Sequence, residues 1–390
     1  MVFCLWMLLL PSPLLDAADP PSPTYPFVIS TDASKYGVRV GQQIPAIARV
    51  GTRWFCIWYG GNQGPPGTSG EGSGCYNIIA VSDDQCQTWK EFAYFIPNPI
   101  VAAQSIIDPR LFAMPEGSLL ILIPVSGQSG GQRSVWSLLL KNPLSKTNQF
   151  VFSAPSFVDF GFVGSAALIA GKVHFTANQN TSGDPPWLRI QGMKLHRVLF
   201  NNGEKIETEL VSHLPYAAAD GSLNTFFEAS MAETAPGNVL AFFRATTGAY
   251  QTRSADGGKT WSAATPFTAH PNAFNTKADL ARSPSGRLVF AFNRTASGRF
   301  NMCVALSDDG GATWPAYYVF DSRTNPGTSY PNVAFGADAQ GNYDGNIFVA
   351  YDHGRGKTAP DYTKEITIAK IPEEGVAAGF PTHTRYIVSK

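Results

Sequence analysis

Two eight-residue stretches of this 390-residue chain, 254–261 and 307–314, follow one pattern, Ser-x-Asp-x-Gly-x-Thr-Trp. A third stretch, 82–89, keeps the Ser, Asp, Thr and Trp but carries Cys86 in place of the glycine. In such a pattern we expect the Asp carboxylate to accept hydrogen bonds from backbone N–H groups of a turn. The Gly takes a positive φ, and the Trp packs beneath the hairpin. The pattern therefore indicates an architecture and says nothing direct about chemistry.

The three stretches resemble the Asp-box, or BNR repeat, of sialidases and related β-propellers. The two complete copies begin 53 residues apart (307 minus 254), a blade-sized period. We predict an all-β, six-bladed β-propeller, with seven blades left open because the fourth strands are poorly defined. The strand-like ends, 25–29 and 384–388, are expected to close the ring by sharing one blade. Six units of strand, turn, strand, loop and strand begin near residues 43, 108, 165, 227, 277 and 330.

Composition narrows the class of protein. Lys plus Arg and Asp plus Glu are both 29, so a zero net charge gives no basic surplus for nucleic acid. The apolar stretch 2–10, followed by small residues up to Ala18, predicts a signal peptide over 1–18 and a secreted protein. Pro11 and Pro13 interrupt this stretch, which is too short to span a membrane. We expect residues 19–390 to form one propeller domain and to act as a monomer.

The cysteines leave two alternatives open. Cys4 would leave with the signal peptide, and an even number then remains, which suits an oxidising compartment. Cys56 and Cys75 flank one loop and would be able to pair across it. The alternative is that all the remaining cysteines are buried free thiols; these are Cys56, Cys75, Cys86 and Cys303.

Propeller geometry identifies the polar residues that converge on one cavity. The innermost strands all run in the same direction, so their first residues and the ends of the second strands cluster at one mouth of the central channel. These positions are rich in cations, carboxylates and a tyrosine, and Arg binds carboxylates with two parallel hydrogen bonds, so the mouth suits an anionic sugar. The expected partner is therefore a glycan substrate. The candidates include Gln43, Asp108, Arg110, Glu228, Lys277, Tyr330, Arg244, Arg299, Asp352, His353 and Arg355.

Nearly the whole mature sequence resembles the sialidase superfamily. The resemblance implies that Glu228 supports a nucleophilic Tyr330, which precedes Pro331 in a Ser-Tyr-Pro-Asn segment. It also implies that Arg244 and Arg299 hold the substrate carboxylate. These residues lie on three different predicted blades, so only closure of the ring would bring them together.

Two positions depart from the family pattern. Gln43 precedes Ile44-Pro45, where the family has a carboxylate-binding Arg. No Asp lies where the family has its acid/base residue, and Glu71 is the only carboxylate available there. Arg110 and Asp108 remain candidates for substrate contacts. The sugar is therefore not fixed as sialic acid by the resemblance.

His353 supports a different reading. With Arg355 it forms an Asp-His-Gly-Arg segment at the end of a second strand. A His at that place suits proton transfer in a polysaccharide lyase acting on a uronate, with Tyr330 as another candidate base. A third alternative is a propeller that binds glycans without catalysis. No motif indicates a cofactor, and a structural Ca²⁺ in a loop stays open.

Overall fold

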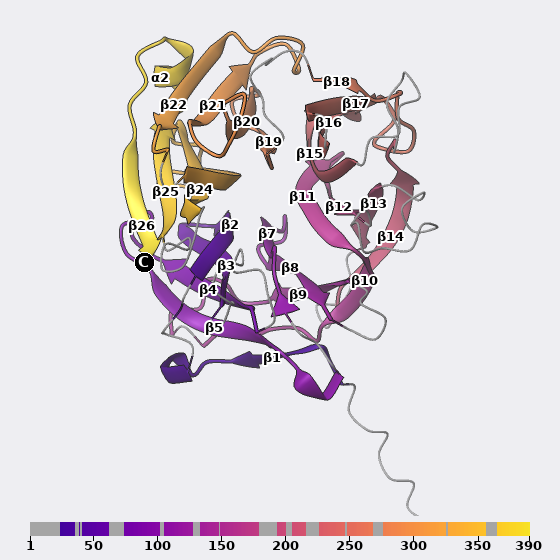
Figure 1. Ribbon diagram of the computed structural model, residues 1–390, viewed down its shortest axis with the longest axis vertical. Coiled ribbons are helices and arrows are strands. Elements are labelled where there is room, and N and C mark those ends of the chain that lie inside the picture. Colours follow the sequence, from indigo (N-terminus) through magenta and orange to yellow (C-terminus); the bar gives the residue numbers. More distant parts are fainter. Residues whose placement is uncertain are drawn as a thin grey trace, which may run out of the picture.

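The structure is a computed structural model in which the chain forms six antiparallel sheets around one central axis (Figure 1). The residues predicted as a signal peptide, 1–18, lie outside the described residues. The described residues are 24–35, 39, 41–61, 74–101, 105–127, 133–147, 149–178, 193–199, 205–215, 226–245, 248–267, 276–324, 327–355 and 365–390.

The first three sheets, blades 1 to 3, follow each other along the chain. Blade 1 contains β1 (Phe27–Ser30), β2 (Gly41–Val50), β3 (Arg53–Gly61), β4 (Tyr76–Ser82) and β5 (Lys90–Pro97). Blade 2 contains β6 (Ser105–Ile106), β7 (Arg110–Ala113), β8 (Leu119–Ser126), β9 (Ser134–Leu140) and β10 (Ser156–Phe160). Blade 3 contains β11 (Phe162–Ile169), β12 (Lys172–Asn178), β13 (Met193–Leu199) and β14 (Glu207–His213).

Blades 4 to 6 each have four strands, and short helices complete the described elements. Blade 4 contains β15 (Phe226–Ala235), β16 (Asn238–Ala245), β17 (Gly248–Ser254) and β18 (Thr265–Pro266). Blade 5 contains β19 (Asp279–Arg282), β20 (Leu288–Asn293), β21 (Met302–Ser307) and β22 (Ala316–Asp321). Blade 6 contains β23 (Gly327–Phe335), β24 (Asn346–Arg355), β25 (Glu365–Pro372) and β26 (Thr384–Ser389). The helices are η1 (Ala33–Lys35), η2 (Pro99–Val101) and α2 (Glu373–Ala377).

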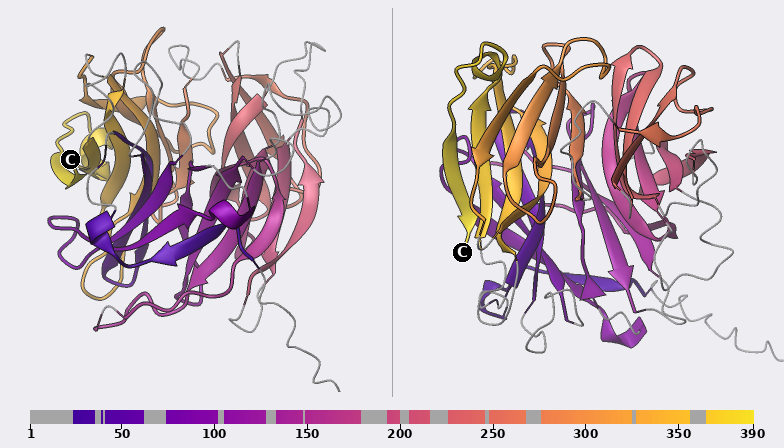
Figure 2. Two further views of the ribbon diagram at one scale, coloured as in Figure 1. Left: turned by 60° about the horizontal axis from the view of Figure 1, so that its bottom comes forward. Right: turned by 45° about the horizontal axis from the view of Figure 1, so that its top comes forward.

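The six-bladed prediction is confirmed, but the predicted ring closure is wrong. The two chain ends do not share a blade: β1 adds to the outer edge of blade 1, and β26 is the outer strand of blade 6. Each blade is therefore complete within one run of sequence. Blades 1 and 6 meet through contacts such as the ring pair of Trp54 and Phe348, whose centroids are 4.2 Å apart. Figure 2 shows β26 lying along the outside of its blade.

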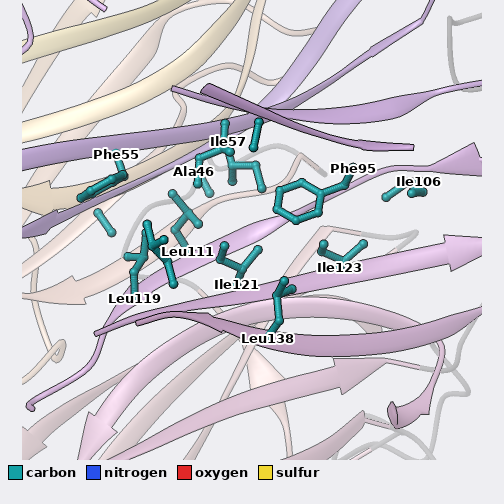
Figure 3. Packing of buried hydrophobic residues seen from close by; sticks show 14 of the residues in the cluster. Ala46, Phe55, Ile57, Phe95, Ile106, Leu111, Leu119, Ile121, Ile123 and Leu138 are labelled. Carbon is teal, nitrogen blue, oxygen red and sulfur yellow. The ribbon is translucent and has the colours of Figure 1, made fainter. Parts of the chain in front are cut away.

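The cores lie between neighbouring blades. Blades 1 and 2 share one cluster of buried aliphatic and aromatic side chains, including Phe55, Ile57, Phe95 and Ile121 (Figure 3). Along β3 and β8 the residues are buried on both faces, because each blade is packed between two others. Burial of this apolar surface fixes the angular position of each blade and so the geometry of the central mouth.

The Ser-x-Asp-x-Gly-x-Thr-Trp motifs form local turns after third strands. In the first complete copy, Asp256 Oδ1 accepts hydrogen bonds from Ser254 Oγ at 2.8 Å and from the Thr260 backbone N–H at 2.9 Å. The damaged copy makes the corresponding bonds, and its Cys86 takes a φ of 71° in place of a glycine. Local hydrogen bonding therefore holds this turn even without the glycine.

The described cysteines are all buried free thiols, so Cys56 and Cys75 do not pair. Burial raises the pKa of the Cys303 thiol to about 12, which leaves it protonated at neutral pH. Within the described ranges, no helix has the length and hydropathy needed to cross a bilayer.

Candidate active site

The innermost strand carries one extra residue at the same height in five blades. In each case the inner strand advances by one residue more than the second strand that it pairs with, which is the signature of a β-bulge. In blade 6, for example, the step from Ser329 to Asn332 faces the shorter step from Asp352 to Ala350. The corresponding steps in the other blades run from 43 to 46, from 106 to 110, from 163 to 166 and from 227 to 230.

Four of these bulges hold a non-glycine residue in the left-handed region. The φ values are 53° at Ile44, 54° at Asp108, 52° at Glu228 and 54° at Tyr330. Such backbone is unfavourable for a β-branched or bulky residue and persists only where the surroundings enforce it. A bulge also changes the direction of the strand and of its side chains. The repeated device therefore turns one side chain per blade at the mouth of the channel.

Just beyond the bulges, polar side chains join blades 3, 4, 5, 6 and 1 in turn. Ser165 Oγ in blade 3 accepts a hydrogen bond from the Met231 backbone N–H of blade 4 at 3.0 Å. Ser230 Oγ in blade 4 donates to Asp279 Oδ1 at 2.9 Å and accepts from the Leu280 backbone N–H at 2.7 Å, both in blade 5. Neighbouring inner strands are thus held at one height.

The same connection continues through blades 5, 6 and 1. Asp279 Oδ2 accepts from the Val333 backbone N–H at 2.8 Å and from Asn332 Nδ2 at 2.9 Å. Asn332 Oδ1 in turn accepts from the Ile47 backbone N–H of blade 1 at 2.8 Å. We call Ser165, Ser230, Asp279 and Asn332 the girdle. Burial raises the pKa of Asp279 to about 6, against the opposing effect of these hydrogen bonds and of Arg110.

The girdle lies at one end of a cavity of 630 Å³ in the central channel. Each blade contributes an apolar side chain, and the walls are mostly apolar; the six are Ile47, Leu111, Ala167, Met231, Leu280 and Val333. In the five blades that have a bulge, these residues follow it along the strand. Of the residues that the sequence predicts for the site, Arg110 lines this cavity, whereas Glu228 and Tyr330 are not among its lining residues.

Glu228, Arg244 and Tyr330 come together at the mouth. An oxygen of Glu228 lies 2.5 Å from a guanidinium nitrogen of Arg244, and both side chains are mostly buried. Burial alone would lower the pKa of Arg244, but Glu228 and a hydrogen-bonding contact with the Tyr330 hydroxyl raise it above its usual value. Blades 4 and 6 thus meet through one guanidinium. The Tyr330 side chain is buried against Ile44 and Tyr59 of blade 1.

Two further cations face the Tyr330 ring from blade 5. The Arg299 guanidinium carbon lies 4.7 Å from the ring centroid, and Lys277 Nζ lies 5.8 Å from it. The Arg299 backbone is held closely, because the Thr328 N–H donates to its carbonyl at 2.8 Å. A Cβ on Gly327 would lie 2.0 Å from that carbonyl oxygen, so only glycine fits there.

Arg110 approaches the same region from blade 2. Its Nε donates to the Gly164 carbonyl of blade 3 at 3.0 Å, and Nη1 donates to the Pro109 carbonyl at 2.7 Å. Nη2 is buried and makes no hydrogen bond to any described residue. Burial lowers the pKa of Arg110, although Asp108 and Asp279 act in the opposite direction.

Comparisons with known proteins agree with the propeller fold. Residues 167–347 match the model of the BNR repeat-like domain. The Hadza microbial sialidase Hz136 superposes with a TM-score of 0.59 at 14% identity, over 86% of this chain and 66% of the sialidase. The chain therefore has the fold of the sialidase β-propellers, and part of it matches the BNR repeat-like domain.

Other solved propellers are similar at low identity. The leech intramolecular trans-sialidase gives a TM-score of 0.57 at 13% identity, over 92% of this chain and 72% of that one. The Penicillium chrysogenum α-L-arabinanase gives 0.57 at 11% identity, over 86% and 94%. No curated protein matches the sequence. At these identities the likeness concerns the fold, and it includes proteins named for different sugars.

In this sialidase-like propeller, Gln43 takes part in a neutral contact. Its Oε1 accepts a hydrogen bond from the Tyr59 hydroxyl at 2.8 Å, and both side chains are almost fully buried. Gln43 therefore fixes Tyr59 beside Tyr330. Its role toward a substrate stays a prediction.

His353 belongs to a separate ionic cluster between blades 5 and 6. Its Nδ1 lies 2.9 Å from Arg323 Nη1, which makes Nδ1 the acceptor and places the proton on Nε2. Arg323 also binds Asp321 and Glu365. Burial, followed by Arg323, lowers the pKa of His353, so the ring is neutral at neutral pH.

The remaining candidates are placed only in part. Asp108 is buried at its bulge. Its charge acts on Arg110 and opposes the lowering of the pKa of that guanidinium by burial. Glu71 lies outside the described residues. The Arg355 backbone pairs with Gly327, and its side chain is not described. No group of three or more His, Cys, Asp or Glu in the described part of the chain is arranged to hold a metal ion.

Two functional features escaped the motif analysis. One is the girdle, whose Ser and Asn residues look unremarkable in sequence. The other is the set of bulges, and here a signal exists: Ile44, Asp108 and Tyr330 all precede a proline at the start of a unit. Three such X-Pro pairs at equivalent places mark the positions where the inner strand turns.

Proposed function

We propose that the protein is an exo-acting glycoside hydrolase that acts on a terminal sugar bearing a carboxylate. The observation that carries this proposal is the contact of Arg244 with both Glu228 and Tyr330, with Arg299 over the Tyr330 ring. A tyrosine held among cations is suited to act as an oxygen nucleophile, because positive charge favours the phenolate.

The proposed reaction follows the retaining route with a tyrosine nucleophile. The Tyr330 oxygen forms a bond to the anomeric carbon as the bond from that carbon to the leaving oxygen breaks, and the phenol proton passes to Glu228. Glu71 is the candidate that protonates the leaving oxygen. In the second step Glu71 takes a proton from a water molecule, whose oxygen attacks the anomeric carbon; the bond to Tyr330 breaks, and Glu228 returns the proton to the Tyr330 oxygen. Arg244 and Arg299 hold the sugar carboxylate during both steps.

Fluorogenic glycosides of N-acetylneuraminic acid, glucuronic acid, glucose and arabinofuranose test the proposal. We expect fluorescence from one of the acidic glycosides and none from the neutral ones. Cleavage of a uronate-containing polysaccharide with a rise in ultraviolet absorbance would replace the hydrolase with a lyase. Binding of glycans without turnover would leave a lectin-like propeller.

A lyase would draw on different residues. His353 is the neutral base that such a mechanism needs, but its Nδ1 is occupied by Arg323. Only Nε2 would be available, and it carries the proton. The Tyr330 cluster therefore supports hydrolysis better than the His353 cluster supports elimination.

A further inference from the structure

Lys277 is a buried cation at the mouth with no hydrogen-bonding group to balance it. The residue precedes β19 in blade 5 and is only 6% exposed. Its Nζ makes no hydrogen bond to any residue that the structure describes. Removing an ammonium group from water is expensive unless an opposite charge replaces the water. A ligand with a negative charge would supply it.

Other cationic nitrogens at the mouth are also buried without a hydrogen bond to a described residue. These are Arg299 Nη1 and Arg110 Nη2. Lys277 and Arg299 face one aromatic ring, that of Tyr330, at 5.8 Å and 4.7 Å. Arg244, in contrast, is already engaged with Glu228. Positive charge that is free to bind a ligand therefore comes mainly from blades 5 and 2.

Blade 1 does not add to this charge. Gln43 stands where a carboxylate-binding Arg was expected, and its amide oxygen is used by Tyr59. Lys277 belongs to blade 5 instead, and its Nζ lies 5.8 Å from the centroid of the Tyr330 ring.

We propose that Lys277 binds the carboxylate of the sugar and takes the place of the guanidinium that Gln43 lacks. The proposal rests on the proposed function in one respect, that the ligand is an anionic sugar. An ammonium group is a compact charge with three donors, so it will hold a carboxylate without the fixed two-bond geometry of an Arg. Loss of the negative charge on the sugar should therefore weaken binding through Lys277.

The test is calorimetric titration, which needs no turnover. The probes are N-acetylneuraminic acid, methyl glucuronoside and the methyl esters of both. We expect wild type to bind one acid at least roughly tenfold more tightly than its ester, as for one charge-assisted interaction. Lys277→Met should weaken binding of the acid by a similar factor and leave the ester unchanged, whereas Lys277→Arg should restore much of the affinity.

The melting temperature of the ligand-free protein tests whether Lys277 has a purely structural role. Because an unpaired buried ammonium opposes folding, Lys277→Met should raise the melting temperature of the ligand-free protein. The matched control is Lys194→Met, because Lys194 is also mostly buried but pairs with Asp159 at 2.9 Å. That variant should melt at a lower temperature than wild type.

The outcomes separate this inference from the proposed function. Binding of an acid that depends on Lys277, without hydrolysis, would uphold the inference and overturn the hydrolase. Hydrolysis of an acidic glycoside that Lys277→Met leaves unchanged would uphold the hydrolase and overturn the inference. Failure of wild type to bind either acid, or a lower melting temperature in Lys277→Met, would also overturn it.

Discussion

The girdle and the mouth lie a few residues apart at the inner strands, and they differ in how their buried polar groups are hydrogen-bonded. In the girdle, both oxygens of Asp279 accept hydrogen bonds from neighbouring blades. At the mouth, Lys277, Arg299 and Arg110 each bury a cationic nitrogen that no described residue accepts. The difference separates polar groups that hold the blades together from groups that are held ready for a ligand.

The largest expected effect concerns the mouth alone. Tyr330→Phe should reduce turnover of the hydrolysed glycoside by several orders of magnitude, because the proposed nucleophilic oxygen is lost. Its melting temperature should change little. The control is Tyr343→Phe, since the Tyr343 hydroxyl binds Glu373 outside the mouth at 2.6 Å. Full activity in Tyr330→Phe would refute the nucleophile and shift attention to His353.

The girdle should respond in stability. Asp279→Ala leaves the Val333 N–H and the Asn332 and Ser230 side chains without their acceptor, so we expect the free energy of unfolding to fall by about 3 kcal/mol or more. Urea denaturation measures this loss. A variant as stable as wild type would show that the inter-blade hydrogen bonds do not hold the ring.

Asp279 also predicts a dependence of stability on pH. Its folded pKa, raised from the usual 3.8 to about 6, favours the folded state below 3.8, and this contribution is lost as pH rises through 6. Unfolding free energy should fall by up to about 3 kcal/mol over that interval from this group. Asp279→Asn keeps an acceptor and a donor but does not titrate. The difference between wild type and Asp279→Asn should therefore change with pH mainly between about 4 and 6 and level off below pH 4; a difference that is the same at every pH would contradict the assignment.

A smaller effect should follow from crowding the mouth without changing a charge. In Gly327→Ala, the added methyl group meets the Arg299 carbonyl and displaces this residue from the Tyr330 ring. We expect a higher KM for an acidic glycoside. Combined with Arg299→Ala, the substitution should add little further loss, because both act through one side chain. Additive losses would show that Gly327 acts elsewhere.

The smallest effect should come from a motif turn, which takes part in neither the girdle nor the mouth. Hydrogen bonds from Thr260 lower the pKa of Asp256 to about 2. This group therefore stabilises the fold above its unfolded pKa of 3.8, and the contribution is lost as pH falls through 2. Asp256→Asn should lower the melting temperature slightly at pH 7 and leave kcat unchanged. Loss of activity at an unchanged melting temperature would contradict a structural role.

Much of the fold is predictable from local chemistry. The Asp, Gly and Trp positions of each motif specify a turn by themselves, and apolar strands at a regular spacing specify the blades. Their spacing places Glu228 and Tyr330 at strand starts. Ring closure was mispredicted because β1 and β26 look equally like strands, and only packing decides which blade edge each one joins.

The sequence predicted where the site residues lie in the propeller better than it predicted which side chains contact each other. Sequence placed Arg244 and Arg299 near Tyr330, yet gave no sign that Gln43 binds Tyr59 or that His353 belongs to the Arg323 cluster. These contacts join different strands or blades, so they depend on the ring as a whole. Lys277 likewise becomes distinctive only through its burial without a partner.

The most direct test of the contrast between girdle and mouth compares one acidic glycoside with its own methyl ester. The leaving group and the ring are the same, and only the negative charge differs. If the unpaired cations at the mouth serve a carboxylate, kcat/KM for the acid should exceed that for the ester by roughly a hundredfold, as expected when two charge-assisted contacts are lost. Equal kcat/KM values for the two glycosides, or hydrolysis of neutral glycosides alone, would contradict the account.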